Sequence, residues 1–487
     1  MILDARNHDV DLGLSVQVAV IGAGPVGLTL ARQLSRHLSV LVVESGGFED
    51  DPEQADLQVG ESIGIAYPLT ETRARGFGGS TSLWAGYCAV FDRHDFEPRD
   101  WVPHSGWPFG FDHIWPYYAA AAKSLNLGSV QFDARTAGLG PPPGGLFASK
   151  DFLPTLWRFG DPTLRLAEQQ SKQFTHRRGP AVLLNAAVVD IRLDNTHRRV
   201  SELSLRTLGG REGRVRAEVV ILACGTIETT RLLLNSDTQL EGGIGNGADQ
   251  VGRYFMEHPH ISAPTIALVD AGPFATWTSR GRGRDGLEFM SCVGLAAEVQ
   301  RTRRILNARA HVYRTPAMAI DETPRVGLFM EQSPCADSRI TLSEQRDALG
   351  LRRVRLDWRL TDLDWESYAV SAELLGNEIE RAHVGCVRPD LAPASRTDNE
   401  VMHSNHHLGA TRMSREAETG VVDANCKVHG LENLYLAGGG LMPTVSWANP
   451  TLTVMALTHR LADHLSERWG VPKPADLSLA AYGAHHS

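Results

Sequence analysis

Three glycines near the start of the chain have the spacing of a dinucleotide-binding turn. Gly22, Gly24 and Gly27 lie in the sequence GAGPVG. The first permits a tight turn, the second lets the backbone approach a pyrophosphate, and the third lets a helix pack close to a strand. Glu44 follows, where a carboxylate can accept hydrogen bonds from a ribose 2′-hydroxyl and would repel a 2′-phosphate. The motif therefore favours NAD or FAD over NADP, and it does not separate NAD from FAD.

Strand and helix patterns flank this turn on both sides. Residues 15–21 (SVQVAVI) are β-branched and apolar, which is typical of a buried strand. After the turn, apolar residues recur at helical spacing: Leu28, Leu30, Ala31 and Leu34. Residues 39–43 (SVLVV) predict a second buried strand that ends at Glu44. Strand, turn, helix and strand within about 30 residues is the context that the motif requires.

Further elements are predicted from the same kinds of pattern. We expect strands in 181–193, 214–222, 354–360 and 433–436, and helices over 227–234, 365–382 and 450–467. The α/β patterns therefore occur at the start, in the middle and at the end of the chain, with irregular strands between them.

Two loops and the end of the chain stand apart from these elements. Residues 139–145 (LGPPPGG) are rich in Pro and Gly, which fits either a lid or a plain connector. Residues 279–286 (SRGRGRDG) are basic and could attract an anionic substrate, although a solvated surface loop fits as well. We expect the last ~20 residues to form a surface tail.

Length, composition and charge restrict the function classes. The 487 residues allow roughly three domains, or one enzyme with two interleaved domains. Hydrophobic residues make up 42% and charged residues 22%, as in globular proteins. The formal charge of −9 argues against nucleic-acid binding, which needs a positive surface.

Neither a membrane span nor a metal-binding motif is expected. No stretch approaches the ~20 apolar residues that a spanning helix needs, and residues 1–17 do not have the pattern of a secretory signal. The six cysteines have no CxxC spacing, so we expect reduced thiols in a cytoplasmic protein, with no iron–sulfur or zinc site.

Four further segments occur in a recognisable order. They are RGFGGSTSLWAG (75–86), VILACGTIETTRLLL (220–234), GNGADQVGRYFMEHP (245–259) and the stretch 404–453, which contains SNHHLGATRMS and SWANPTLT. Together with the dinucleotide motif they resemble the glucose–methanol–choline (GMC) oxidoreductases, which are FAD-dependent. The Asn-Pro-Thr near the C-terminus is similar to the subgroup of pyranose oxidases and sugar dehydrogenases.

The resemblance implies a fold of mixed class, α/β plus α+β. A Rossmann-like FAD-binding domain would be built from discontinuous segments, beside a substrate domain with an antiparallel sheet. The expected FAD-binding segments are 1–90, 171–259 and 401–470. The expected substrate-binding segments are 91–170 and 260–400, and 471–487 would be the C-terminal tail.

The resemblance also implies two catalytic residues. His406 stands three residues before Gly409, where the family has a catalytic histidine, and Asn449 matches the second catalytic position. A neutral imidazole suits removal of a hydroxyl proton, and an amide N–H can hold the substrate oxygen as charge develops on it. His407 is the rival if the alignment is off by one residue, and Asn449 before Pro450 could instead be a turn residue.

The implied FAD contacts extend beyond the first motif. The family's flavin-facing turns and strand ends match Gly78, Gly79, Ser80, Thr81, Val188, Ala223, Cys224, Gly225, Gly439, Gly440, Pro450 and Thr451. Some pyranose oxidases attach FAD through a histidine, and the matching position here is Leu83, so we expect non-covalent FAD. Cys224 is expected to be a small packing residue and Trp84 a core aromatic residue.

The function implied by the resemblance is oxidation of an alcohol to a carbonyl, with oxygen or another electron acceptor. The expected substrate is a carbohydrate, a polyol or a sugar-bearing natural product. Alternatives are a steroid or aryl-alcohol oxidoreductase, a flavoprotein subunit of a membrane dehydrogenase complex, a catalytically silent flavoprotein scaffold, and an NAD-dependent dehydrogenase.

Overall fold

A parallel sheet carries the dinucleotide turn. The computed structural model describes residues 1–128, 130, 132, 145–175, 179–261, 266–268, 277–313, 325–383, 385–387 and 401–470. The eight strands of this sheet are β1 (Ile2–Asp4), β6 (Ala181–Leu184), β3 (Val40–Val43), β2 (Gly13–Ile21), β9 (Glu212–Leu222), β8 (Val200–Arg206) and β7 (Ala187–Leu193), in that order, with β20 (Leu434–Leu436) beside β9. From β1 to β9 the pairs are parallel, and β9–β8 and β8–β7 are antiparallel.

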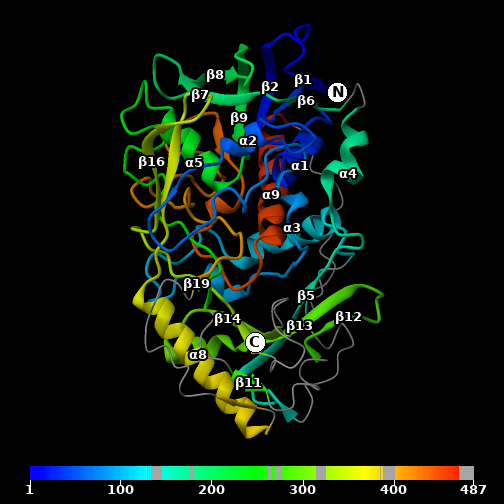
Figure 1. The fold of residues 1–487 in the computed structure, drawn as a ribbon, viewed down its shortest axis with the longest axis vertical. Coiled ribbons are helices and arrows are strands. Elements are labelled where there is room, and N and C mark those ends of the chain that lie inside the picture. The colour runs from blue at the N-terminus through cyan, green and yellow to red at the C-terminus, as the bar shows by residue number, and fades with distance from the viewer. Residues whose placement is uncertain are drawn as a thin grey trace.

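The central strands are apolar because helices cover the sheet. All four residues of β3 and the last four of β2 and β9 are buried, as in parallel sheets packed on both faces. The covering helices include α1 (Pro25–Leu34), α5 (Thr226–Asn235) and α9 (Thr451–Arg468). α9 packs against α1 and against α3 (Phe111–Ser124). Figure 1 shows these helices beside the sheet in the upper half of the molecule.

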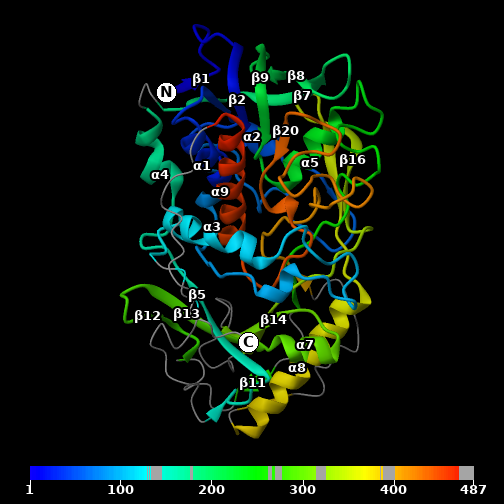
Figure 2. The same cartoon turned by 180° about the vertical axis from the view of Figure 1, so that it is seen from behind.

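A second, antiparallel sheet lies in the lower half of both views (Figure 1 and Figure 2). Its strands are β12 (Arg280–Arg282), β13 (Glu288–Leu295), β14 (Ala308–Tyr313), β15 (Arg325–Met330), β11 (Ile266–Leu268) and β18 (Gly385–Val387), with β5 (Phe152–Arg158) paired to β13. The long helix α8 (Asp362–Arg381) runs beside it. The expected combination of an α/β sheet with an antiparallel sheet is confirmed.

Smaller elements complete the described part of the chain. A three-stranded sheet consists of β16 (Arg339–Arg346), β17 (Arg352–Asp357) and β4 (Glu61–Ser62), and a two-stranded one of β10 (His260–Ile261) and β19 (Val401–Met402). The short helices are α2 (Pro52–Asp56), α4 (Leu166–Gln170) and α7 (Ala297–Arg303), with 3₁₀ turns η1 (Gly79–Ser82), η2 (Arg93–Phe96), η4 (Ser171–Phe174) and η7 (Gly439–Leu441). Within the described residues, no helix has both the length and the apolar character needed to cross a bilayer.

The structure divides one predicted segment and corrects two others. Over 181–193, where strand is predicted, Asn185 with φ of +59° separates two strands, β6 and β7; Asn tolerates this left-handed conformation. The strand expected over 354–360 ends earlier, at Asp357. Residues 280–282 of the expected basic loop form β12, which pairs with β13.

Two arginines of the basic segment 279–286 form ion pairs with acidic residues. Arg280 forms an ion pair with Glu288, and Arg282 forms one with Asp161. These pairs neutralise two of its guanidinium groups, which weakens the hypothesis that it attracts an anionic substrate. Of the Pro-rich loop, residues 139–144 lie outside the described residues, as does the expected tail 471–487.

Candidate active site

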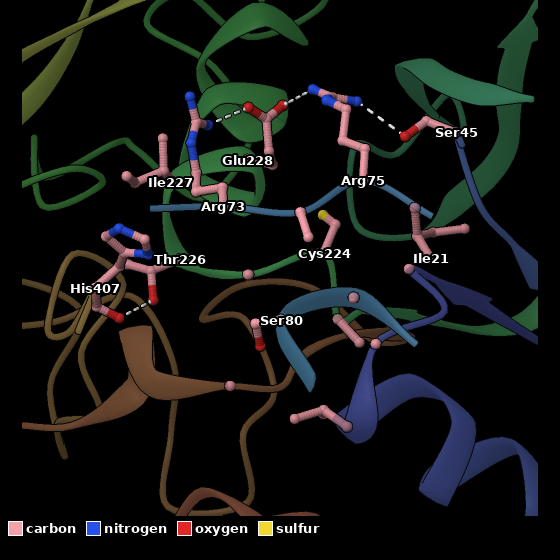
Figure 3. Close-up of a pocket in the computed structure, with 18 of the residues that line it drawn as sticks. Ile21, Ser45, Arg73, Arg75, Ser80, Cys224, Thr226, Ile227, Glu228 and His407 are labelled. Carbon is pink, nitrogen blue, oxygen red and sulfur yellow. Dashed lines mark hydrogen bonds and ion pairs between the residues drawn. The ribbon is translucent and has the colours of Figure 1, made fainter. Parts of the chain in front are cut away.

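A cavity of about 280 Å³ lies where the glycine turn after β2 meets the segment 405–408. In Figure 3, Ile21 and Ser45 lie toward one side of this pocket, and Thr226 and His407 toward the other. Cys224 and Ser80 lie between them in the same view. Residues from distant parts of the chain therefore line one continuous space.

Most of the expected cofactor-binding residues line this pocket. The lining includes Gly22, Gly24, Glu44, Gly79, Ser80, Val188, Ala223, Cys224, Gly225, Gly439, Pro450 and Thr451. Four expected residues are not part of the lining: Gly27, Gly78, Thr81 and Gly440. Of these, Gly27 and Gly78 pack against the backbone of the first turn, at Gly22 and Ala23 respectively.

The three glycines of the first turn have different surroundings. A Cβ added to Gly22, which has φ of +107°, would lie 2.6 Å from the carbonyl oxygen of Ala223. One added to Gly27 would lie 1.9 Å from the carbonyl oxygen of Gly22. Both positions exclude a side chain because backbone fills the space. At Gly24 an added Cβ would meet nothing within 4 Å, so a side chain there would enter the pocket itself.

The second glycine turn packs directly on the first. The N–H of Gly78 donates to the carbonyl oxygen of Ala23 (2.8 Å), and a Cβ on Gly79 would lie 2.9 Å from the Cα of Gly24. Thr81 is buried, and its hydroxyl donates to the carbonyl oxygen of Gly78 (2.7 Å). Thr81 therefore stabilises the turn, although it does not line the pocket.

Glu44 joins three backbone segments around the pocket. Its Oε2 accepts from the N–H of Ala23 (2.8 Å), while Oε1 accepts from the N–H groups of Gly46 (3.0 Å) and Gly76 (3.2 Å). The sequence predicts a ribose acceptor at this position. The structure adds a second role that sequence reasoning misses, which is to hold the turns together.

Two arginines and a glutamate form a wall of the pocket that was not predicted (Figure 3). Glu228 in α5 accepts from Arg73 (2.5 Å) and from Arg75 (2.6 Å). Burial alone would raise the pKa of Glu228, but the guanidinium groups of Arg75, Arg231 and Arg73 lower it to about 2. These ion pairs tie the segment before the second glycine turn to α5.

Cys224 behaves as a packing residue. Its Sγ lies 3.4 Å from the hydroxyl of Thr229, and burial raises the pKa of its thiol to about 12. The thiol therefore remains protonated at neutral pH, which argues against a reactive thiolate. Cys88, Cys224, Cys292, Cys335 and Cys426 are free thiols in the structure.

The two expected catalytic side chains lie next to each other. Asn449 immediately precedes Pro450 and α9, and its Nδ2 is 3.4 Å from Nε2 of His406. His406 lines the pocket; Asn449 does not, but it contacts His406. Within the described residues, the buried Oδ1 of Asn449 has no hydrogen-bond partner. Burial, followed by the nearby imidazoles of His258 and His407, lowers the pKa of His406 well below its usual value.

His258 is a third member of this cluster and was not predicted. Its Nδ1 lies 2.8 Å from Nδ1 of His406, and its Nε2 lies 3.1 Å and 3.0 Å from the carbonyl oxygens of Val445 and Ser446. The segment GRYFMEHP contains it, but no spacing in the sequence links it to His406. Only the folded chain brings these two residues together.

Glu257 holds the backbone of the cluster. Its fully buried carboxyl group accepts from the N–H groups of His406 (2.6 Å) and His258 (2.6 Å) and from the hydroxyl of Tyr67 (2.9 Å). Burial raises its pKa to about 8, and these hydrogen bonds limit the rise. Glu257 thus fixes the two histidine-bearing segments relative to each other.

His407 has different contacts. Its Nε2 lies 3.2 Å from the hydroxyl of Thr72, and its backbone carbonyl accepts a short hydrogen bond from Thr226. Burial lowers its pKa to about 3. The imidazole of His407 therefore contacts Thr72, whereas that of His406 contacts Asn449.

Comparison with known proteins relates part of the chain to a described family. Residues 334–458 match the family described as GMC oxidoreductase. This C-terminal part of the chain is similar to the GMC oxidoreductases. The resemblance drawn from the sequence motifs is therefore confirmed, including in the C-terminal stretch that carries His406 and Asn449.

Individual relatives cover nearly the whole chain. The chain is 24% identical to paromamine 6'-oxidase of Streptomyces fradiae, over 91% of this chain and 90% of the relative. It is 26% identical to 6'''-hydroxyparomomycin C oxidase of Streptomyces lividus, over 92% of both. A formate oxidase variant of Aspergillus oryzae, solved in a study of FAD modification, has a similar fold, with a TM-score of 0.62 at 16% identity over 94% of this chain and 99% of that one.

Proposed function

We propose that this chain is a GMC oxidoreductase and uses FAD to oxidise an alcohol to a carbonyl. One observation carries the proposal: a single pocket is lined both by the dinucleotide turn at Gly24 and by the buried imidazole of His406. The first feature suits a pyrophosphate at the N-terminus of α1, and the second suits removal of a hydroxyl proton.

The residues of the pocket fit FAD. The open space beside Gly24 leaves room for a pyrophosphate, which the N–H groups at the start of α1 would bind. Glu44 lines the same pocket, and its Oε2 accepts from Ala23 alone among the described residues, so it has capacity for a ribose hydroxyl. When bound, FAD supplies the hydride acceptor for the reaction.

His406 and Asn449 would act on the substrate hydroxyl group. The Nε2 of His406 would take the hydroxyl proton, which typically contributes about 10²–10⁴-fold in rate. The Nδ2 of Asn449, 3.4 Å from that nitrogen, would donate to the substrate oxygen as negative charge develops on it. Asn449 is then an orienting donor rather than only a turn residue.

We further propose that the substrate is a carbohydrate, polyol or sugar-bearing natural product. Two relatives that match over nine-tenths of the chain are named for oxidation of aminoglycosides. The expected division of the chain fits this proposal. Residues 1–90, 171–259 and 401–470 would bind FAD, and 91–170 and 260–400 would bind the substrate.

The test is an anaerobic visible spectrum of the purified chain, recorded before and after adding sugars, glycosides, aminoglycosides, steroids and aryl alcohols. We expect a yellow flavin band that the sugar-bearing alcohols bleach. Admitting air then distinguishes oxygen from another electron acceptor. Bleaching by steroids or aryl alcohols alone would refute the substrate class, and a colourless protein that reduces NAD would refute the whole proposal.

FAD is proposed to be non-covalent. The resemblance matches Leu83 to the flavin-linked histidine of some pyranose oxidases, and the Leu83 side chain is half exposed and unreactive. In the same experiment, acid precipitation is expected to release the flavin into the supernatant. Flavin that stays with the pellet would contradict this part of the proposal.

We also propose that the protein works in the cytoplasm. The five cysteines with described side chains are free thiols, as is usual in a reducing compartment. Fractionation of the producing cells would test this, since activity recovered outside the cytoplasmic fraction would contradict it.

A further inference from the structure

We propose that His258 is a positioning residue that fixes which nitrogen of His406 carries the proton. This inference rests on the proposed function of His406 as the proton acceptor. His258 does not contact Nε2 of His406 or Nδ2 of Asn449, the two atoms proposed to act on the substrate. It contacts Nδ1, the other nitrogen of the His406 ring.

The outer contacts of His258 determine its own tautomer. Its Nε2 lies 3.1 Å from the carbonyl oxygen of Val445 and 3.0 Å from that of Ser446. Carbonyl oxygens only accept hydrogen bonds, so Nε2 must carry the hydrogen. His258 is fully buried, which lowers its pKa to about 4 and keeps it neutral. A neutral imidazole has one N–H, so its Nδ1 is a bare acceptor.

The tautomer of His406 follows from that of His258. The two Nδ1 atoms are 2.8 Å apart, which is a hydrogen-bond distance. Since Nδ1 of His258 is the acceptor, Nδ1 of His406 must be the donor. The neutral His406 ring therefore has its lone pair on Nε2, the nitrogen that faces Nδ2 of Asn449. Nε2 is the only nitrogen of this ring left to take a proton.

The backbone around the pair holds this geometry. Glu257 accepts from the N–H groups of both His258 and His406, and the hydroxyl of Ser404 donates to the carbonyl oxygen of His258 (2.7 Å). These bonds hold together the two backbone segments that carry the imidazoles. Without an acceptor at Nδ1, His406 could carry its hydrogen on Nε2 instead, and that tautomer cannot accept the substrate proton.

A matched pair of substitutions separates the two contacts of His258. In His258→Asn, the side-chain oxygen can take the place of the Nδ1 acceptor. In His258→Gln, the terminal amide can still donate to the carbonyl oxygens, but the acceptor facing His406 is gone. We expect His258→Gln to slow reduction of the bound flavin by substrate by roughly 10²-fold and His258→Asn to recover most of that loss.

The direct readout is the histidine ¹H–¹⁵N spectrum of the ¹⁵N-labelled, flavin-loaded full chain. We expect hydrogen on Nδ1 of His406 and on Nε2 of His258 in the wild type, and a mixture of His406 tautomers in His258→Gln. His459→Gln is the control, since it removes another buried histidine, in α9, and should leave the His406 signals unchanged. Comparison of the spectra of the His258 and His459 variants with that of the wild type assigns the signals to individual histidines.

The outcomes separate this inference from the proposed function. Hydrogen on Nε2 of wild-type His406 would overturn the inference, as would equal behaviour of His258→Asn and His258→Gln. The wild-type spectrum decides the matter even if a variant does not fold. Failure of every alcohol to reduce the flavin would instead refute the proposed function, while leaving the tautomer measurement intact.

Discussion

Replacing His406 by Asn is expected to slow reduction of the bound flavin by substrate by about 10²–10⁴-fold, the usual contribution of a general base. The Asn side chain can still donate to Nδ1 of His258, so the cluster keeps this contact, but it cannot take a proton. Anaerobic stopped-flow reduction of the flavin measures the rate. The flavin content should stay the same, because the pocket's dinucleotide turn is untouched.

His407→Asn is the matched comparison. The same change one residue later removes an imidazole that bonds Thr72 and does not face Asn449. We expect a much smaller loss of rate. Equal losses in both variants, or a larger one in His407→Asn, would mean that the proton acceptor is not His406.

The pH dependence of the wild type gives the same assignment a second test. A histidine accepts a proton only when it is neutral, and burial with its neighbouring imidazoles lowers the pKa of His406 well below its usual value. The acid limb of kcat/KM should therefore lie below pH ~6.5, the usual histidine pKa. The same profile for His406→Asn should lack that limb.

Replacing Gly24 by Val is expected to weaken FAD binding strongly without disturbing the backbone. Among the three glycines of the first turn, it is the one where a side chain would meet the cofactor rather than the protein backbone. An added Cβ meets no protein atom within 4 Å and enters the pocket, so the chain should fold while the cofactor is displaced. Overpacking costs about 1–3 kcal/mol, which corresponds to roughly 5–150-fold in Kd. Titration of the apoprotein with FAD measures this change.

Gly110→Val is the control for Gly24→Val. Gly110 also precedes a helix, in extended backbone, and its added Cβ likewise meets nothing within 4 Å, but it does not line the pocket. Its FAD affinity should match that of the wild type. A Gly24→Val chain that bound FAD normally would exclude the pyrophosphate from the turn.

Local patterns in the sequence were sufficient for the dinucleotide turn and its flanking elements. Although the backbone that crowds Gly22 belongs to the distant Ala223, the spacing of Gly22, Gly24 and Gly27 between two apolar strands is a local pattern that predicts the turn. The same holds for α5 and α8, whose observed bounds lie close to the predicted ones. Asn185 shows the limit, because its left-handed conformation breaks a strand whose alternation continues through it.

Contacts between distant segments could not be predicted in this way. His258 meets His406 across 148 residues, and Arg73 meets Glu228 across 155. Neither pair has a characteristic spacing, because the tertiary fold alone brings these segments together. Glu44 was expected to face a ribose, yet its bond to Gly76 depends on a turn 32 residues away. His258 and Glu228 both lie within segments quoted for the resemblance, so what the sequence could not show was their partners, which are far away in the chain.

A crystal structure of the flavin-loaded chain tests the central proposal most directly. We expect the pyrophosphate beside Gly24 at the start of α1, and the isoalloxazine ring at the end of the pocket lined by His406. Nε2 of His406 and Nδ2 of Asn449 should lie on the face of the ring where the substrate binds. A flavin bound in the reverse direction, with its adenine next to His406, would contradict the proposal.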